Sequence, residues 1–239
     1  ISFMIKKKAV FEVSFLWLGS ILGALTAFIT QVLLARELGP DTLGMFASVF
    51  SFIALLTPLA GFGVSQYWLK AFGTEGMIAC RWLSGSFRFI SISTTIIMLL
   101  VGLWAFFGPN DPLSKTVTLI MSTYILGQLA IELVSVRFQL EEKYILLALW
   151  QFTPHALRLL LVGTLLCVDN LSFNLINVAF IYALVSILVF MIGAPLLLQM
   201  KSNKFNLKGH ATKNKSAPPQ TEKPSIKRIK VSSNSAFHV

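Results

Sequence analysis

The sequence has few charged residues, and few acidic ones in particular. Charged side chains make up 13% of the 239 residues, about half of the roughly 25% that soluble domains carry. Hydrophobic residues make up 55% and occur in blocks of about 20 to 28 residues. Each block is long enough for the roughly 20 residues that cross the hydrocarbon core of a bilayer. A soluble core cannot bury six such blocks, so the scarcity of charge excludes a soluble globular protein.

The apolar blocks also lack the alternation of polar and apolar residues that membrane β-barrels show. Backbone groups in lipid must hydrogen-bond internally, which leaves α-helices. We therefore predict an all-α, polytopic membrane protein with six transmembrane helices. The predicted domains are a basic N-terminus (1–10), a six-helix bundle (11–200) and a basic tail (201–239), whose composition predicts disorder. The expected helices cover residues 11–35, 42–59 with an extension to 72, 85–107, 115–136, 144–168 and 173–200.

Cysteines and catalytic motifs are scarce as well. Cys80 and Cys167 are the only cysteines and fall on opposite membrane faces in this topology, which excludes an intrachain disulfide between them. The sequence has no phosphate-loop motif, no H-E-x-x-H metal motif and no nucleophile elbow. We therefore expect no enzyme activity, no metal and no cofactor.

Most of the net charge of +10 lies in the loops and the tail, which is a topology signal and no indication of nucleic-acid binding. Three basic residues lie in the N-terminus, three around the second loop, two in the fourth loop and nine in the tail. Among the basic residues outside the spans, only Arg36 and Lys115 fall on the opposite face of the membrane. The bias predicts that both termini are cytoplasmic. The tail is then either a solvated segment or a partner of anionic membrane lipid.

The expected helix 144–168 carries polar residues deep in the membrane. Gln151, His155 and Arg158 are spaced by four and three residues, so they share one helical face. At 1.5 Å per residue, Arg158 lies roughly 21 Å from one helix end and roughly 15 Å from the other. Such a cation suits a water-filled cavity that holds an anionic ligand, or an arginine satisfied by backbone carbonyls or waters in the bundle. The remaining alternatives are an arginine that snorkels to a membrane face and a helix end that lies elsewhere. His155 is either a structural hydrogen-bonding residue or a proton relay.

The expected helix 115–136 carries a second polar stripe, which includes Tyr124, Gln128 and Glu132. Glu132 lies near the cytoplasmic end, too shallow for a direct ion pair with Arg158. Two roles remain open for Glu132. It is either a proton-coupling carboxylate or an interface residue paired with Arg137 or Lys143.

Two further patterns concern the backbone. Pro58 lacks an amide donor, and Gly61 and Gly63 relax the backbone, so we expect a break and a candidate hinge in the second helix. Gly19 and Gly23 in the first helix let another helix approach closely, either within the chain or in a dimer.

The first helical hairpin carries a leucine-rich helix followed by an L-x-A-R-x-L-G-P pattern, and a P-L-A-x-x-G segment follows in the second helix. Over residues 11–72 the sequence resembles the N-terminal part of the oligosaccharide flippases. These form the polysaccharide transport branch of the multidrug/oligosaccharidyl-lipid/polysaccharide exporter superfamily. The matching positions are Leu33, Ala35, Arg36, Leu38, Gly39, Pro40, Gly44 and Phe46, and then Pro58, Leu59, Ala60 and Gly63.

The resemblance implies a MATE-like bilobed transporter in the bacterial inner (cytoplasmic) membrane, with two six-helix bundles around a central cavity. Such a transporter moves a polyprenyl-pyrophosphate-linked oligosaccharide to the outer leaflet by alternating access. Arg158 would attract the pyrophosphate, in a cavity lined also by Gln31, Gln151 and His155. Six helices correspond to one lobe, so we expect a truncated half or a half that pairs with a second lobe or a second copy.

Two other interpretations stay open. The chain is half of a cation-coupled multidrug exporter, which would need membrane acids in the cavity, where only Glu132 qualifies. Alternatively, it is a membrane remnant or assembly partner that transports nothing.

Overall fold

The protein is all-helical in the part of the chain that the computed structural model describes, residues 2–108, 111–167 and 174–201. Four segments of this part are long and apolar enough to cross a membrane. They are Ser14–Phe107, Pro112–Leu140, Tyr144–Cys167 and Leu175–Met200. The prediction of a helical membrane protein is thus confirmed at this level, and the predicted disordered tail lies outside the described residues.

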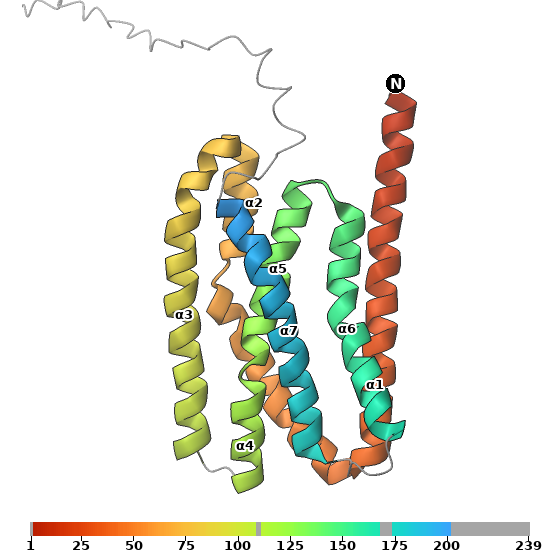
Figure 1. The fold of residues 1–239 in the computed structure, drawn as a ribbon, viewed down its shortest axis with the longest axis vertical. Helices are drawn as coiled ribbons and strands as arrows, with labels where there is room; N and C mark the ends of the chain where they lie inside the picture. The colour runs from red at the N-terminus through yellow and green to blue at the C-terminus, as the bar shows by residue number, and fades with distance from the viewer. Residues whose placement is uncertain (1, 109–110, 168–173, 202–239) are drawn as a thin grey trace, which may run out of the picture. The chain divides into compact units, whose positions relative to one another are not determined.

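Seven α-helices and one short 3-10 helix make up the described elements. The 3-10 helix η1 joins α2 to α3, and the helices lie side by side along the long axis of Figure 1. The bounds are α1 Ser2–Gly61, α2 Val64–Glu75, η1 Gly76–Ala79, α3 Cys80–Phe107, α4 Pro112–Met121, α5 Tyr124–Leu140, α6 Tyr144–Cys167 and α7 Leu175–Lys201.

The polar turn expected at residues 36–41 is a sharp kink at one residue. α1 is helical on both sides of Gly39, which has φ 74° and ψ 169°, a conformation open only to glycine without strain. Pro40 follows, and its missing N–H is tolerated in the first turn of the next helical stretch. The chain changes direction here (Figure 1).

The break expected in the second helix is present. α1 ends at Gly61, Phe62 and Gly63 have positive φ values of 43° and 72°, and α2 begins at Val64. Pro58 itself stays inside α1, because the amide of Phe62 still donates to its carbonyl at 2.9 Å. The role of this break as a hinge remains a prediction.

The helix expected at 115–136 is corrected by the structure, which has two helices there. α4 and α5 are separated at Ser122 and Thr123, whose hydroxyls donate to the carbonyls of Leu119 and Ile120 at 2.7 and 2.8 Å. Such local side-chain bonds compete with the helical ladder. α5 then continues to Leu140, so Arg137 is helical and buried, whereas the sequence placed it in a loop.

Other boundaries also differ from the expected ones. α1 begins at Ser2, before the expected start at residue 11. The expected loop 73–84 is mostly helical, because α2 reaches Glu75, η1 follows and α3 begins at Cys80.

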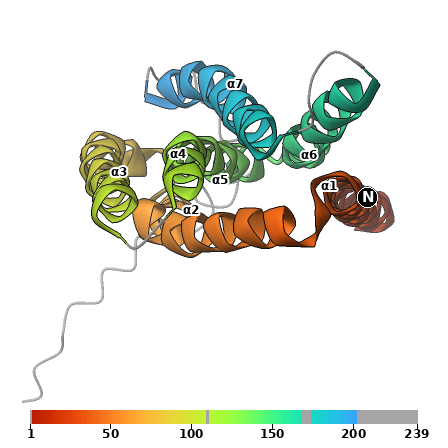
Figure 2. The same cartoon turned by 90° about the horizontal axis from the view of Figure 1, so that it is seen from below.

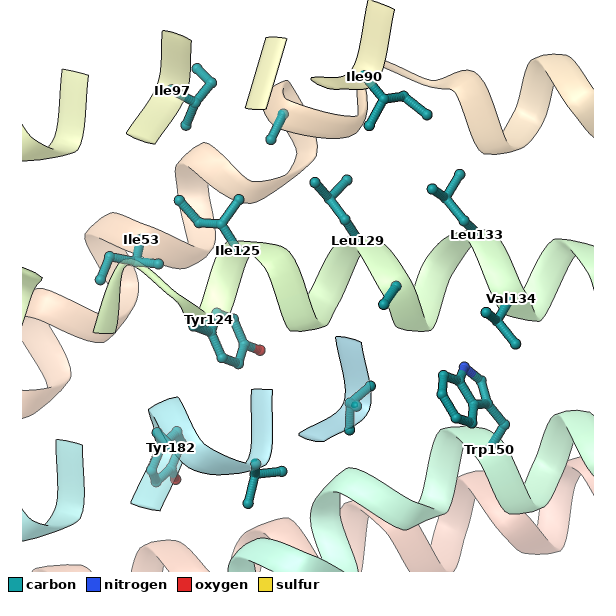
Figure 3. Close-up of a cluster of buried hydrophobic side chains, with 14 of the residues drawn as sticks. Ile53, Ile90, Ile97, Tyr124, Ile125, Leu129, Leu133, Val134, Trp150 and Tyr182 are labelled. Carbon is teal, nitrogen blue, oxygen red and sulfur yellow. The ribbon is translucent and has the colours of Figure 1, made fainter. Parts of the chain in front are cut away.

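α5 lies at the centre of the described helices, with α7 on one side and the second half of α1 on the other (Figure 2). Its contact with α7 is very close at Gly127, where an added Cβ would lie 2.7 Å from the Cα of Ser186. Ile125, Leu129 and Leu133 point from one side of α5, and Tyr124 and Val134 from the other (Figure 3). Tyr182 of α7 and Trp150 of α6 lie on that second side, where the Trp150 indole donates to the Ile131 carbonyl at 3.2 Å.

Candidate functional site

The predicted site residues lie around two neighbouring cavities. Gln151, His155 and Arg158 of α6 line a cavity of about 430 Å³ between α6, α5 and the first half of α1. Gln31 lines a second cavity of about 160 Å³, to which His155 and Arg158 also contribute. The structure therefore brings all four residues to one region of the protein.

The wall contributed by α1 is made of small residues. Gly19, Ser20, Gly23 and Ala24 line the larger cavity. An added Cβ on Gly19 would lie 3.0 Å from the Cβ of Ala148 in α6. The close approach that the glycine pair was expected to permit is thus used within the chain, between α1 and α6.

Arg158 is buried, with 8% of its surface exposed, and its charge faces aromatic rings. Its Cζ lies 5.1 Å from the ring centroid of Tyr124 and 4.9 Å from that of Tyr182. Among the described residues, no carboxylate lies within 4.0 Å of the guanidinium and Nε has no hydrogen-bond partner. No backbone carbonyl of the described residues accepts a hydrogen bond from the guanidinium, which lines both cavities.

The sequence did not predict the aromatic residues that surround Arg158. Tyr124 was recognised as part of a polar stripe, whereas Tyr182 lies in α7 and was not singled out. Phe50 packs edge-on against both tyrosines, at centroid distances of 5.3 and 5.9 Å, and Phe46 against Tyr182 at 5.3 Å. The only signal in the sequence was that Tyr182 is the single tyrosine of this largely apolar span.

Glu132 does not belong to this site. Its carboxylate accepts a hydrogen bond from the buried Ser65 hydroxyl of α2, and an added Cβ on Gly61 would lie 3.4 Å from Glu132 Oε2. Every four residues, a helix completes one turn and rotates about 40° further. Tyr124 and Glu132 are eight residues apart on α5, so their side chains face different neighbours. Among the described residues, Glu132 has no ion pair, which corrects its expected pairing with Arg137 or Lys143.

Arg137 is instead part of a compact cluster at the end of α5. Its Nε donates to Glu141 Oε1 at 2.9 Å, and its other nitrogens donate to the Leu196 carbonyl and to Gln199 Oε1 at 3.4 Å. Lys143 Nζ lies 2.6 Å from Glu141 Oε2. Burial alone would raise the pKa of Glu141, but its bonds to Lys143 and Arg137 outweigh burial and hold the pKa below its usual value. This cluster joins α5 to α7 and has a structural role.

The chemistry open to the larger cavity is the binding of an anion. Its polar side chains offer hydrogen-bond donors around one positive charge, and they are Ser20, Tyr124, Gln128, Gln151, His155 and Arg158. No group of three or more His, Cys, Asp or Glu that could hold a metal occurs within residues 2–108, 111–167 and 174–201. Both cysteines are free.

Comparison with known proteins adds no relative. A scan against models of protein families and searches of curated proteins and of solved structures found no match.

Proposed function

We propose that the protein is a six-span membrane transporter lobe that binds the pyrophosphate of a polyprenyl-linked oligosaccharide at Arg158 and carries it across the cytoplasmic membrane. The observation that carries the proposal is the buried guanidinium of Arg158. It has no carboxylate partner among the described residues and lines a cavity of about 430 Å³. A buried charge without a partner is unfavourable, and an anionic ligand would supply the missing interaction.

The interruptions of the longest apolar segment support the proposed six crossings. Residues 14–107 contain the kink at Gly39 and, further on, Gly76 with φ 60° at the start of η1. If the chain reverses at both places, this segment supplies three crossings and the other three apolar segments supply one each. The charge distribution supports an orientation with both termini in the cytoplasm.

A half transporter would need a second lobe to close the cavity. Gln31 lines the smaller cavity but is exposed on α1, in a stretch of apolar residues. A second six-helix lobe, or a second copy of the chain, would cover it.

The position of Glu132 favours the flippase over the cation-coupled multidrug exporter. Such an exporter needs an acid in its cavity, and Glu132 lines neither of the two cavities. It lies instead beside the break at Gly61, where a role in coupling would have to act through α2.

The test is the binding of an anionic lipid to the purified full-length protein. Isothermal titration calorimetry in detergent with farnesyl pyrophosphate should show saturable binding that Arg158→Gln reduces by at least tenfold. The matched control is Lys115→Gln, which removes a positive charge from α4 outside both cavities and should bind like the wild type.

Transport is measured separately in proteoliposomes. A fluorescent polyprenyl-pyrophosphate oligosaccharide should become accessible to a membrane-impermeant quencher faster than in empty liposomes, and Arg158→Gln should abolish the difference. Unchanged lipid binding in Arg158→Gln would refute the site, whereas binding without transport would favour an assembly partner.

A further inference from the structure

Tyr124 and Tyr182 occupy the place beside Arg158 that a carboxylate usually takes next to a buried arginine. The Cζ atom of Arg158 lies over both rings, at 5.1 and 4.9 Å from their centroids. The negative faces of the rings attract the cation, so they stabilise it in the absence of an acid. Unlike a carboxylate, they leave the site with its full positive charge.

The contact with the rings also leaves the hydrogen-bonding capacity of Arg158 unused. A guanidinium carries five N–H donors in a fixed planar fork, which matches two oxygens of a phosphate or carboxylate. Within the described residues, Nε of Arg158 is buried without a partner, and no side chain or carbonyl accepts from the remaining nitrogens. The two terminal nitrogens of the fork are therefore free for a ligand, whereas Nε is covered by the surrounding protein.

The two rings are themselves held in place. Phe46 and Phe50 of α1 pack edge-on against them, with centroid distances of 5.3 Å for Phe46–Tyr182 and for Phe50–Tyr124. Tyr182 is buried, and so is Tyr124. These contacts and the burial restrict the positions of both rings.

We propose that Tyr124 and Tyr182 are positioning residues, which hold Arg158 by cation–π attraction so that its charge and its donor fork stay available to an oxyanion with two free oxygens. This inference rests on the function proposed above for the same cavity. The proposed function requires only the positive charge of Arg158, whereas this inference also specifies the geometry of the anion that Arg158 binds. A phosphate-type group suits the fork, whereas a halide can use only the charge.

The experiment separates the aromatic ring from the hydroxyl. Inorganic pyrophosphate and farnesyl pyrophosphate are titrated into the purified full-length protein in detergent at constant ionic strength. Tyr182→Leu, which removes the ring, should weaken binding of both probes roughly tenfold, the size that a desolvated cation–π contact supports. Tyr182→Phe keeps the ring and should stay within about twofold of the wild type. Tyr124→Leu should weaken binding to a similar extent. Phenylalanine is the matched control at Tyr182 alone, because Tyr124 also lines the larger cavity as a hydrogen-bond donor.

Two control variants complete the design. Tyr67→Leu changes an exposed tyrosine of α2 that lines neither cavity, so it should leave binding unchanged. Arg158→Lys keeps the charge but lacks the planar fork, and it should lose the preference for pyrophosphate over chloride in a competition titration. Circular dichroism and gel filtration check that each variant is folded. Should a leucine variant fail this check, methionine, which fills space without a ring, replaces leucine at the same position.

The outcomes distinguish this inference from the proposed function. Binding within twofold of the wild type in both leucine variants, together with loss in Arg158→Gln, overturns the inference and leaves the proposed function intact. Unchanged binding in Arg158→Gln contradicts the proposed function itself. Tighter binding of farnesyl pyrophosphate than of inorganic pyrophosphate supports a lipid headgroup as the anion, and equal binding supports a soluble one.

Discussion

Arg137 and Arg158 are equally buried, at 8% exposure each, and their surroundings differ completely. Arg137 is satisfied by Glu141, by a carbonyl of α7 and by Gln199. Arg158 lies against two tyrosine rings, and in the described chain it has no carboxylate partner. Arg137 shows that this fold can supply an ion pair and hydrogen bonds to a buried arginine. The unpaired state of Arg158 is therefore a specific feature, and it separates a residue that joins helices from a residue that is available to a ligand.

The largest expected effect is on stability and concerns Arg137. Arg137→Met should lower the free energy of unfolding by about 3–5 kcal/mol, because it removes one of the two cations that pair with the buried Glu141 and also the donor to the Leu196 carbonyl. Reversible unfolding in mixed micelles, followed by tryptophan fluorescence, measures the change. The control is Arg81→Met, whose ion pair with Glu75 is 58% exposed on the arginine side and should contribute no more than about 1 kcal/mol. Equal losses in the two variants would remove the distinction between them.

The second prediction concerns the spacing of α5 and α7, on which both arginine sites depend. Gly127→Ala should destabilise the protein by about 1–3 kcal/mol, because its Cβ would lie 2.7 Å from backbone and side-chain atoms of Ser186. It should also weaken anion binding, since Tyr124 and Tyr182 lie on these two helices. Gly102→Ala in α3 meets nothing within 4 Å and should be neutral or stabilising by about 0.5–1 kcal/mol. The same unfolding assay tests both, and a harmless Gly127→Ala would contradict the close contact.

The third prediction is a pH dependence that belongs to the Arg137 cluster. The pKa of Glu141 lies below its usual value, so its ionised form stabilises the folded state. This contribution is complete above the unfolded pKa of about 4.3 and is lost as the pH falls through the lower folded value. Unfolding measured from pH 7 to pH 3 should show the loss in the wild type. Glu141→Gln should have a flatter profile over that range, and an identical profile would exclude Glu141 as its source.

The smallest expected effect on stability is that of Arg158→Met. Replacing an unpaired buried charge by an apolar side chain of similar length should change the free energy of unfolding by less than about 1 kcal/mol, or stabilise the protein. The same variant should bind pyrophosphate at least tenfold more weakly. A loss as large as that of Arg137→Met would indicate that Arg158 has a structural role after all.

Much of the site was predictable because its residues are close in sequence. Gln151, His155 and Arg158 follow helical spacing, so one face of one helix brings them together without any knowledge of the fold. The break near Gly63 was predictable for the same reason, since glycine and proline act on the local backbone.

The partners of each polar group were not predictable. Tyr182 reaches Arg158 from α7, and Ser65 reaches Glu132 from α2, across distances in sequence that no local pattern covers. The interruption at Ser122 was also missed, because serine and threonine occur in the interior of other helices of this chain without interrupting them, as Ser135 does in α5.

The sequence by itself determined that the chain is helical and apolar enough for a membrane, and where the polar residues of each span lie. These properties depend on composition and on the period of the α-helix, and both are local. The tertiary structure decided which arginine is neutralised and which keeps its charge. Neutralisation depends on contacts a few ångströms long between different helices, and the packing of α5, α6 and α7 sets those distances.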